Sequence, residues 1–87
     1  MCKNRYCIEV SGSRTGREPL IGSLIENSAN LTTEFSYRNG GYTFFFKYKG
    51  DARLVLKRMT KQFSGKSLPV NNEYSHEGAV ARIKKIS

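Results

Sequence analysis

Residues 31–49 read LTTEFSYRNGGYTFFFKYK and contain two alternating runs on either side of an Asn39-Gly40 pair. Asn-Gly between two such runs favours a type I′ hairpin turn, because both central residues of that turn need a positive φ. Alternation with a period of two is typical of half-buried strands. We therefore predict a strand over residues 31–37 and a returning strand over residues 42–49. One face of the returning strand would carry Tyr42, Phe44, Phe46 and Tyr48, and the other Thr43, Phe45, Lys47 and Lys49.

The N-terminal third of the chain predicts a strand followed by a short helix. Residues 5–10 alternate between the two faces of a strand, with Tyr6, Ile8 and Val10 on one of them. Residues 11–16, SGSRTG, are predicted to be a loop. Pro19 suits the first turn of a helix, which we expect to end near residues 27–30. The apolar face of this helix would consist of Leu20, Ile21, Leu24 and Ile25.

A second helix is predicted after the hairpin. Gly50 ends the returning strand, Asp51 can cap the helix, and Ser64-Gly65 is a plausible C-terminal stop. The core-facing positions of this helix are spaced i, i+3, i+4, i+7 and i+11, and they are Ala52, Val55, Leu56, Met59 and Phe63. Residues 66–78 are predicted to be a loop, and residues 79–86 a last strand.

The order of these elements is strand, helix, strand, strand, helix, strand. It predicts an α+β, ferredoxin-like β-α-β-β-α-β fold with a four-stranded antiparallel sheet and two helices on one face. The 87 residues are expected to form one small basic domain over residues 1–87, because a second core would not fit in this length.

The charge of the chain is strongly asymmetric. Fifteen Lys and Arg against seven Asp and Glu give a net charge of +8, and residues 38–87 supply all of it because residues 1–37 balance to zero. On the second helix, Arg53, Lys57 and Lys61 repeat every four residues on the side away from the predicted core, with Arg58 beside them. A field of this kind attracts polyanions or acidic proteins, so the sequence predicts a partner of opposite charge.

No catalytic constellation is visible in the sequence. The single histidine, His76, falls in a predicted loop without an acid or a nucleophile at a recognisable spacing. Cys2 and Cys7 with one histidine do not make a four-ligand zinc set, and Cys7 is most simply a small buried residue of the first strand. We therefore expect no enzyme, no metal and no cofactor. The chain has no apolar run near the roughly 20 residues of a membrane span and no signal-peptide core, so no membrane insertion and a cytoplasmic location are expected.

One candidate partner is nucleic acid. The stretch over residues 41–46, GYTFFF, is similar in character to the aromatic third strand on which RNA-recognition domains stack bases. Core packing is the simpler explanation for Tyr42, Phe44 and Phe46, because they alternate as core residues do. The basic helix could still hold phosphates without reading a base sequence. A small phage-type inhibitor of a nucleic-acid machine is also compatible with the size and charge.

The partner that the sequence favours over these alternatives is an acidic protein, and this prediction rests on a resemblance carried by short motifs. Asn4-Arg5 precedes Glu-Val-x-Gly-x-Arg over residues 9–14. Residues 38–48 contain Arg38, then Gly40 two residues later, then the predicted strand, which includes Tyr48. Residues 58–61 read Arg-Met-Thr-Lys, and Gly78 precedes the last strand. Together these motifs resemble the CpcD-like linker domain of phycobilisomes, the family of small rod-capping and core-capping linkers.

The resemblance implies a non-enzymatic linker that docks on an acidic phycobiliprotein trimer or hexamer, associated with the thylakoid surface. It would bind by charge complementarity, with exposed aromatic anchors as interfaces favour. The expected positive surface is Arg38, Lys47, Lys49, Arg53, Lys57, Arg58 and Lys61, and the expected anchors are Tyr48 and Phe45.

Overall fold

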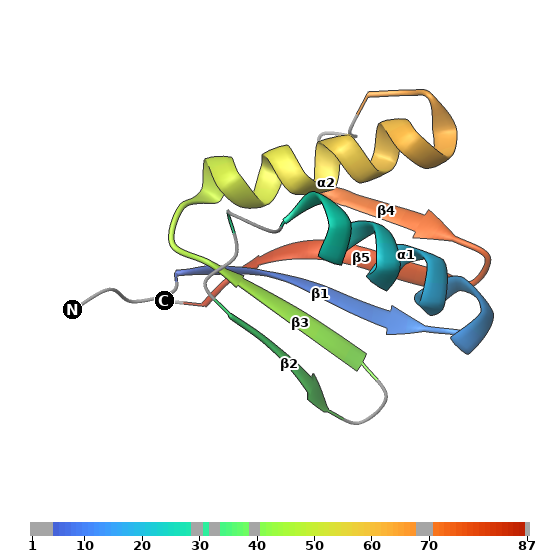
Figure 1. Ribbon diagram of the computed structural model, residues 1–87, viewed down its shortest axis with the longest axis horizontal. Coiled ribbons are helices and arrows are strands. Elements are labelled where there is room, and N and C mark those ends of the chain that lie inside the picture. Colours follow the sequence, from blue (N-terminus) through green and yellow to red (C-terminus); the bar gives the residue numbers. More distant parts are fainter. Residues whose placement is uncertain (1–4, 29–30, 32–33, 39–40, 68–70, 87) are drawn as a thin grey trace.

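The chain folds as β-α-β-β-α-β with one additional strand before the last. The computed structural model describes residues 5–28, 31, 34–38, 41–67 and 71–86, and for residues 34, 35, 37 and 38 it describes the backbone alone. In chain order the elements are β1 (Tyr6–Gly12), α1 (Arg14–Asn27), β2 (Glu34–Arg38), β3 (Gly41–Phe46), α2 (Lys49–Ser64), β4 (Glu73–His76) and β5 (Ala79–Lys85). Figure 1 shows both helices on the same side of the sheet.

The sheet has the strand order β2-β3-β1-β5-β4, and every neighbouring pair is antiparallel. α1 leads from β1 to β2 with β3 between them, and α2 leads from β3 to β5 with β1 between them. The ferredoxin-like α+β arrangement is therefore confirmed. The hairpin of β2 and β3 is also confirmed, with Arg38 opposite Gly41, although the turn predicted at residues 39–40 lies outside the described residues.

The sheet has one strand more than the four expected. The prediction of a loop throughout residues 66–78 is wrong, because Glu73–His76 form β4 and pair with β5. Glu77 and Gly78 form the two-residue turn between them, with φ of 47° and 84°, as a type I′ turn requires. His76 therefore lies in a strand and not in a loop. The strand is only four residues long, and its Glu-Gly turn is a weaker sequence signal than Asn-Gly.

The hydrophobic core lies between the sheet and the two helices. Phe44 and Phe46 are fully buried in it, as predicted from their alternation along β3, and Tyr42 is partly buried at its border. The predicted core positions of α2 are confirmed as well, with Phe63 partly buried and Ala52, Val55, Leu56 and Met59 completely buried. Burial of these apolar side chains is the main favourable contribution to folding in a domain of this size.

The start of α1 differs from the expectation. β1 continues to Gly12 and α1 begins at Arg14, so residues 11–16 are not a loop and Pro19 lies inside the helix rather than in its first turn. Ser13 is the N-cap residue, and its hydroxyl oxygen accepts a hydrogen bond from the backbone N–H of Gly16 at 3.3 Å. This cap fixes the start of the helix, although Pro19 removes one helical hydrogen-bond donor.

Ser13 also ties the start of α1 to the turn between β4 and β5. Its backbone N–H donates to the carbonyl oxygen of Gly78 at 3.0 Å, and its hydroxyl donates to the carbonyl oxygen of Glu77. Gly12 and Gly16 leave room for this approach, because a Cβ at either position would overlap a carbonyl oxygen of the turn or of the strand before it. The β1–α1 junction and the last hairpin thus form one packed unit.

The start of α2 also differs from the expectation. β3 ends at Phe46, Tyr48 is the N-cap residue without a side-chain cap, and Asp51 lies in the first turn instead of capping the helix. Lys47 and Tyr48 therefore lie in the connection to α2, and Lys49 in the helix itself. The predicted end is confirmed, since α2 stops at Ser64 and the left-handed Gly65 (φ 72°) donates its N–H to the carbonyl oxygen of Lys61 at 2.8 Å.

Candidate functional site

The outer side of α2 is a surface of positive side chains. We define the basic face as the five exposed cations of this helix, Lys49, Arg53, Lys57, Arg58 and Lys61. At 3.6 residues per turn, Arg53, Lys57, Arg58 and Lys61 share the side of the helix that is turned away from the buried stripe, and Lys49 is exposed at the first residue of the helix. The structure therefore brings together the part of the predicted positive surface that lies on α2.

The basic face has no negative counterpart in the described part of the chain. Residues 47–66 contain seven Lys or Arg and a single Asp, which is a net charge of +6 out of +8. The ion pairs among the described residues lie elsewhere, for example Arg82 with Glu73 at 3.7 Å and Lys84 with Glu9 at 3.2 Å. Because the cations of β5 are partly neutralised and those of α2 are not, the positive field is concentrated on α2.

An exposed tyrosine extends this surface at the N-terminal end of α2. Tyr48 is 62% exposed, and the ammonium group of Lys47 lies 5.7 Å from the centre of its ring, within the range of a cation–π interaction. Tyr48 is thus exposed as expected of an anchor, although it belongs to the N-cap and not to a strand face.

Sequence reasoning missed Leu54, which is 38% exposed on the outer side of α2. It follows Arg53 and lies one turn before Arg58, so it adds a small apolar area among the cations. The helical spacing that identified the core residues of α2 also places Leu54 on the outer side of the helix, so the sequence contained the signal.

Phe45 and Arg38 do not join the basic face. Phe45 alternates with the buried Phe44 and Phe46, so it lies on the sheet face opposite the helices, where it pairs with Cys7 and is half-buried. The backbone of Arg38 pairs with Gly41 at the start of β3, while α2 follows the other end of that strand. The two ends are about 17 Å apart along five residues of strand. The predicted site is therefore divided, with Phe45 on the sheet face opposite the helices and the backbone of Arg38 at the far end of β3 from α2.

Cys7 is buried, with 6% of its surface exposed, as predicted. It lies on the sheet face without helices. Burial raises the pKa of its thiol, the carboxylate of Glu9 adds to the rise, and Lys84 partly opposes it. Since the thiolate is the reactive form, the burial of Cys7 and the raised pKa of its thiol both disfavour a role as a nucleophile.

Alkylation tests this assignment. In a Cys2→Ser variant, we expect iodoacetamide at pH 8 to modify Cys7 more slowly in the folded protein than in urea, because the raised pKa and the burial both lower the concentration of accessible thiolate. Because the pKa of the Cys7 thiol is higher in the folded protein, this thiol is deprotonated at a lower pH in the unfolded chain than in the folded one. The free energy of unfolding therefore decreases as the pH rises above the pKa of the unfolded thiol. Equal alkylation rates in the two states would show that Cys7 is accessible.

Within the described ranges, the structure contains no group of three or more His, Cys, Asp or Glu side chains that could hold a metal ion. The same residues include no helix that is both long enough and apolar enough to cross a membrane. Comparison of the chain with protein-family models, with curated proteins and with solved structures found no match.

Proposed function

We propose that this protein is a binding protein rather than an enzyme, and that it docks through the basic face of α2 on a polyanion, with a nucleic-acid backbone as the preferred partner. The observation that carries the proposal is the concentration of charge on α2. Six of the eight net charges belong to residues 47–66, and the basic face has no ion pair among the residues described.

The spacing of the cations supports a partner with a regular row of charges. Arg53, Lys57 and Lys61 follow one another every four residues, which is about 6 Å along a helix axis. Arg58 adds a charge beside this row. A sugar–phosphate backbone offers anions in a row, and neutralising them releases counterions, which drives association without base recognition.

The composition of the surface favours phosphate over an acidic protein. Three of the five cations of the basic face are lysines, and the exposed apolar side chains nearby are Leu54 and Tyr48. Lysine is depleted in protein–protein interfaces, whose centres are apolar and aromatic. A lysine-rich helix with few apolar contacts suits phosphate contacts better.

The second candidate is the phycobilisome linker, in which the basic face would dock on an acidic phycobiliprotein trimer or hexamer. One observation favours it. Gly12 and Gly78 belong to two of the motifs that carry the resemblance, and they meet in the fold, since a Cβ on Gly12 would overlap the carbonyl oxygen of Gly78. Residues far apart in the sequence that share the family pattern are thus neighbours in space.

A binding measurement with several probes separates the two candidates. We would titrate the full chain into a fluorescein-labelled DNA duplex of about 20 base pairs, into an RNA strand of similar length, and into purified phycobiliprotein hexamers, all at one salt concentration. The proposal predicts saturable binding to nucleic acid with little dependence on base sequence. Binding to the hexamers alone would replace the first candidate by the second, and binding to none of these probes would contradict both.

A further inference from the structure

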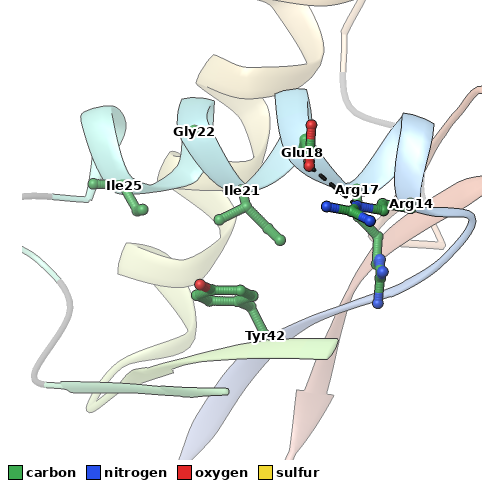
Figure 2. A pocket seen from close by; sticks show the side chains of 7 residues that line it. All are labelled: Arg14, Arg17, Glu18, Ile21, Gly22, Ile25 and Tyr42. Carbon is green, nitrogen blue, oxygen red and sulfur yellow. Dashed lines mark hydrogen bonds and ion pairs between the residues drawn. The ribbon is translucent and has the colours of Figure 1, made fainter. Parts of the chain in front are cut away.

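A groove with a volume of about 610 Å³ lies between α1 and β3. Figure 2 shows the ring of Tyr42 beneath Ile21, with Ile25 towards one end of the groove and the two arginines towards the other. The opposite side of α1 is occupied by α2, because the hydroxyl of Ser23 donates to the side-chain oxygen of Gln62 at 2.7 Å. The groove is therefore separate from the basic face. Its lining residues are Arg14, Arg17, Glu18, Ile21, Gly22, Ile25 and Tyr42.

The apolar part of the groove is formed by Ile21, Ile25 and Tyr42. The Tyr42 ring stacks on the ring of the buried Phe44, its neighbour on the same face of β3, with 6.4 Å between their centres. This contact restricts the movement of the tyrosine ring that forms the floor of the groove. Ile25 is 49% exposed and Ile21 is half-buried. An exposed isoleucine beside a tyrosine ring gains contact area when an apolar side chain covers it.

The charged part of the groove leaves one arginine without an acidic partner. Arg14 pairs with Glu18 at 3.4 Å, whereas half-buried Arg17 has no ion pair among the described residues. Arg17 also lies near the N-terminal end of α1, where the helix dipole favours an anion. The groove thus combines an apolar floor with a guanidinium group at one end.

The spacing along α1 matches an extended chain. Arg17, Ile21 and Ile25 are four residues apart, and each step is about 6 Å along the helix. Side chains on one face of an extended peptide recur every second residue, about 6.6 Å apart. A segment of the form acidic-x-apolar-x-apolar therefore places its carboxylate at Arg17 and its apolar side chains at Ile21 and Ile25.

We propose that this groove is a peptide-binding site for a partner protein, and that it takes an extended segment of the pattern acidic-x-apolar-x-apolar, which can run in either chain direction. The peptide carboxylate pairs with Arg17, and the two apolar side chains cover Ile21, Ile25 and the ring of Tyr42. The volume falls within the roughly 300–1,000 Å³ of typical ligand sites. This site does not depend on the function proposed for α2.

The test is an NMR titration of the ¹⁵N-labelled full chain with acetyl-ESLSL-amide and with the reversed acetyl-LSLSE-amide. We expect one of the two to shift the amide signals of residues 14–25 and of Tyr42 in a saturable way. Replacing its Glu by Gln is expected to weaken binding about tenfold, since a charge-assisted contact is lost. Arg17→Gln is expected to give a similar loss, and the exposed variant Ile25→Ser a smaller one.

The control is Lys57→Gln on the basic face, which is expected to leave peptide affinity unchanged. Three results would overturn the proposal: no saturable shift with either peptide, equal affinity of the Glu and Gln peptides, or shifts centred on α2 that Lys57→Gln abolishes. Equal or tighter binding of octanoate at the same residues would contradict a peptide as the occupant, and shifts of residues 14–25 by single-stranded RNA would assign the groove to nucleic acid instead. Unchanged thermal unfolding of the variants confirms that each one is folded.

Discussion

Gly16→Ala is expected to lower the free energy of unfolding by about 3 kcal/mol, at the upper end of the usual cost of forcing extra atoms into a packed site. A Cβ at this position would overlap the carbonyl oxygen of His76 and would lie 2.8 Å from both the carbonyl oxygen of Glu77 and the Cβ of Ala79. Two of these atoms are backbone, so no side-chain rotation relieves the overlap. α1 would have to move away from the β4–β5 turn, which also strains the bonds that Ser13 makes there.

Gly22→Ala is the matched control, because Gly22 is exposed in the same helix and a Cβ there would meet nothing within 4 Å. It is expected to be neutral or to stabilise the protein by up to about 1 kcal/mol, since alanine favours a helix over glycine. Urea unfolding followed by circular dichroism measures both variants. Equal stability of the two would show that α1 does not pack against the last hairpin as described.

Neutralising the middle of the basic face is expected to weaken nucleic-acid binding strongly. In Lys57→Gln/Lys61→Gln, two phosphate contacts are lost, and each is worth somewhat less than tenfold in affinity at about 0.1 M salt. We therefore expect a loss of roughly 60-fold, measured by fluorescence anisotropy with the labelled duplex. Stability should hardly change, because both side chains are exposed and have no ion pair in the part of the chain that is described.

The matched control is Arg82→Gln/Lys84→Gln on β5. It removes the same number of positive charges from the sheet face opposite the helices, together with surface ion pairs to Glu73 and Glu9, each worth less than about 1 kcal/mol. We expect it to weaken binding less than about threefold, because these residues lie away from the basic face and distant charges are screened. An equal loss in both pairs would mean that net charge, and not the location on α2, determines affinity.

The sequence predicted the parts of the structure that depend on local periodicity. The stripe from Ala52 to Phe63 fixed both the buried side and the basic side of α2, so its cations could be placed before any coordinates. The burial of Phe44 and Phe46 and the hairpin of β2 and β3 were predicted correctly for the same reason. Each of these patterns is a property of one element and its immediate neighbours in the chain.

The parts that the sequence did not predict depend on contacts between distant segments. β4 is stabilised by pairing with β5, and α1 starts early because Gly12 and Gly16 pack against the turn at Glu77 and Gly78. The expectation of a loop over residues 11–16 also hid the groove, because it left Arg14 outside the helix that in fact begins at this residue. A helix starting after Ser13 would have placed both arginines in line with the isoleucines.

The assignment of Phe45 and Tyr48 shows a limit of alternation as a guide to function. Extending β3 to Lys49 put Tyr48 on the core face and Lys47 and Lys49 beside Phe45, whereas the strand ends at Phe46. The chain then turns into α2, and Tyr48 is exposed. Where a strand stops is set by the helix that follows, and no residue in this stretch marks the change.

The salt dependence of binding tests the central proposal, docking of the basic face on phosphates, most directly. With the labelled duplex, the logarithm of the association constant is expected to fall linearly with the logarithm of salt concentration between about 50 and 200 mM. The five cations of the basic face predict a slope of about −4.5, and Lys57→Gln/Lys61→Gln should reduce it to about −2.7. A slope near zero, or one that this pair leaves unchanged while the pair on β5 reduces it, would contradict phosphate binding by α2.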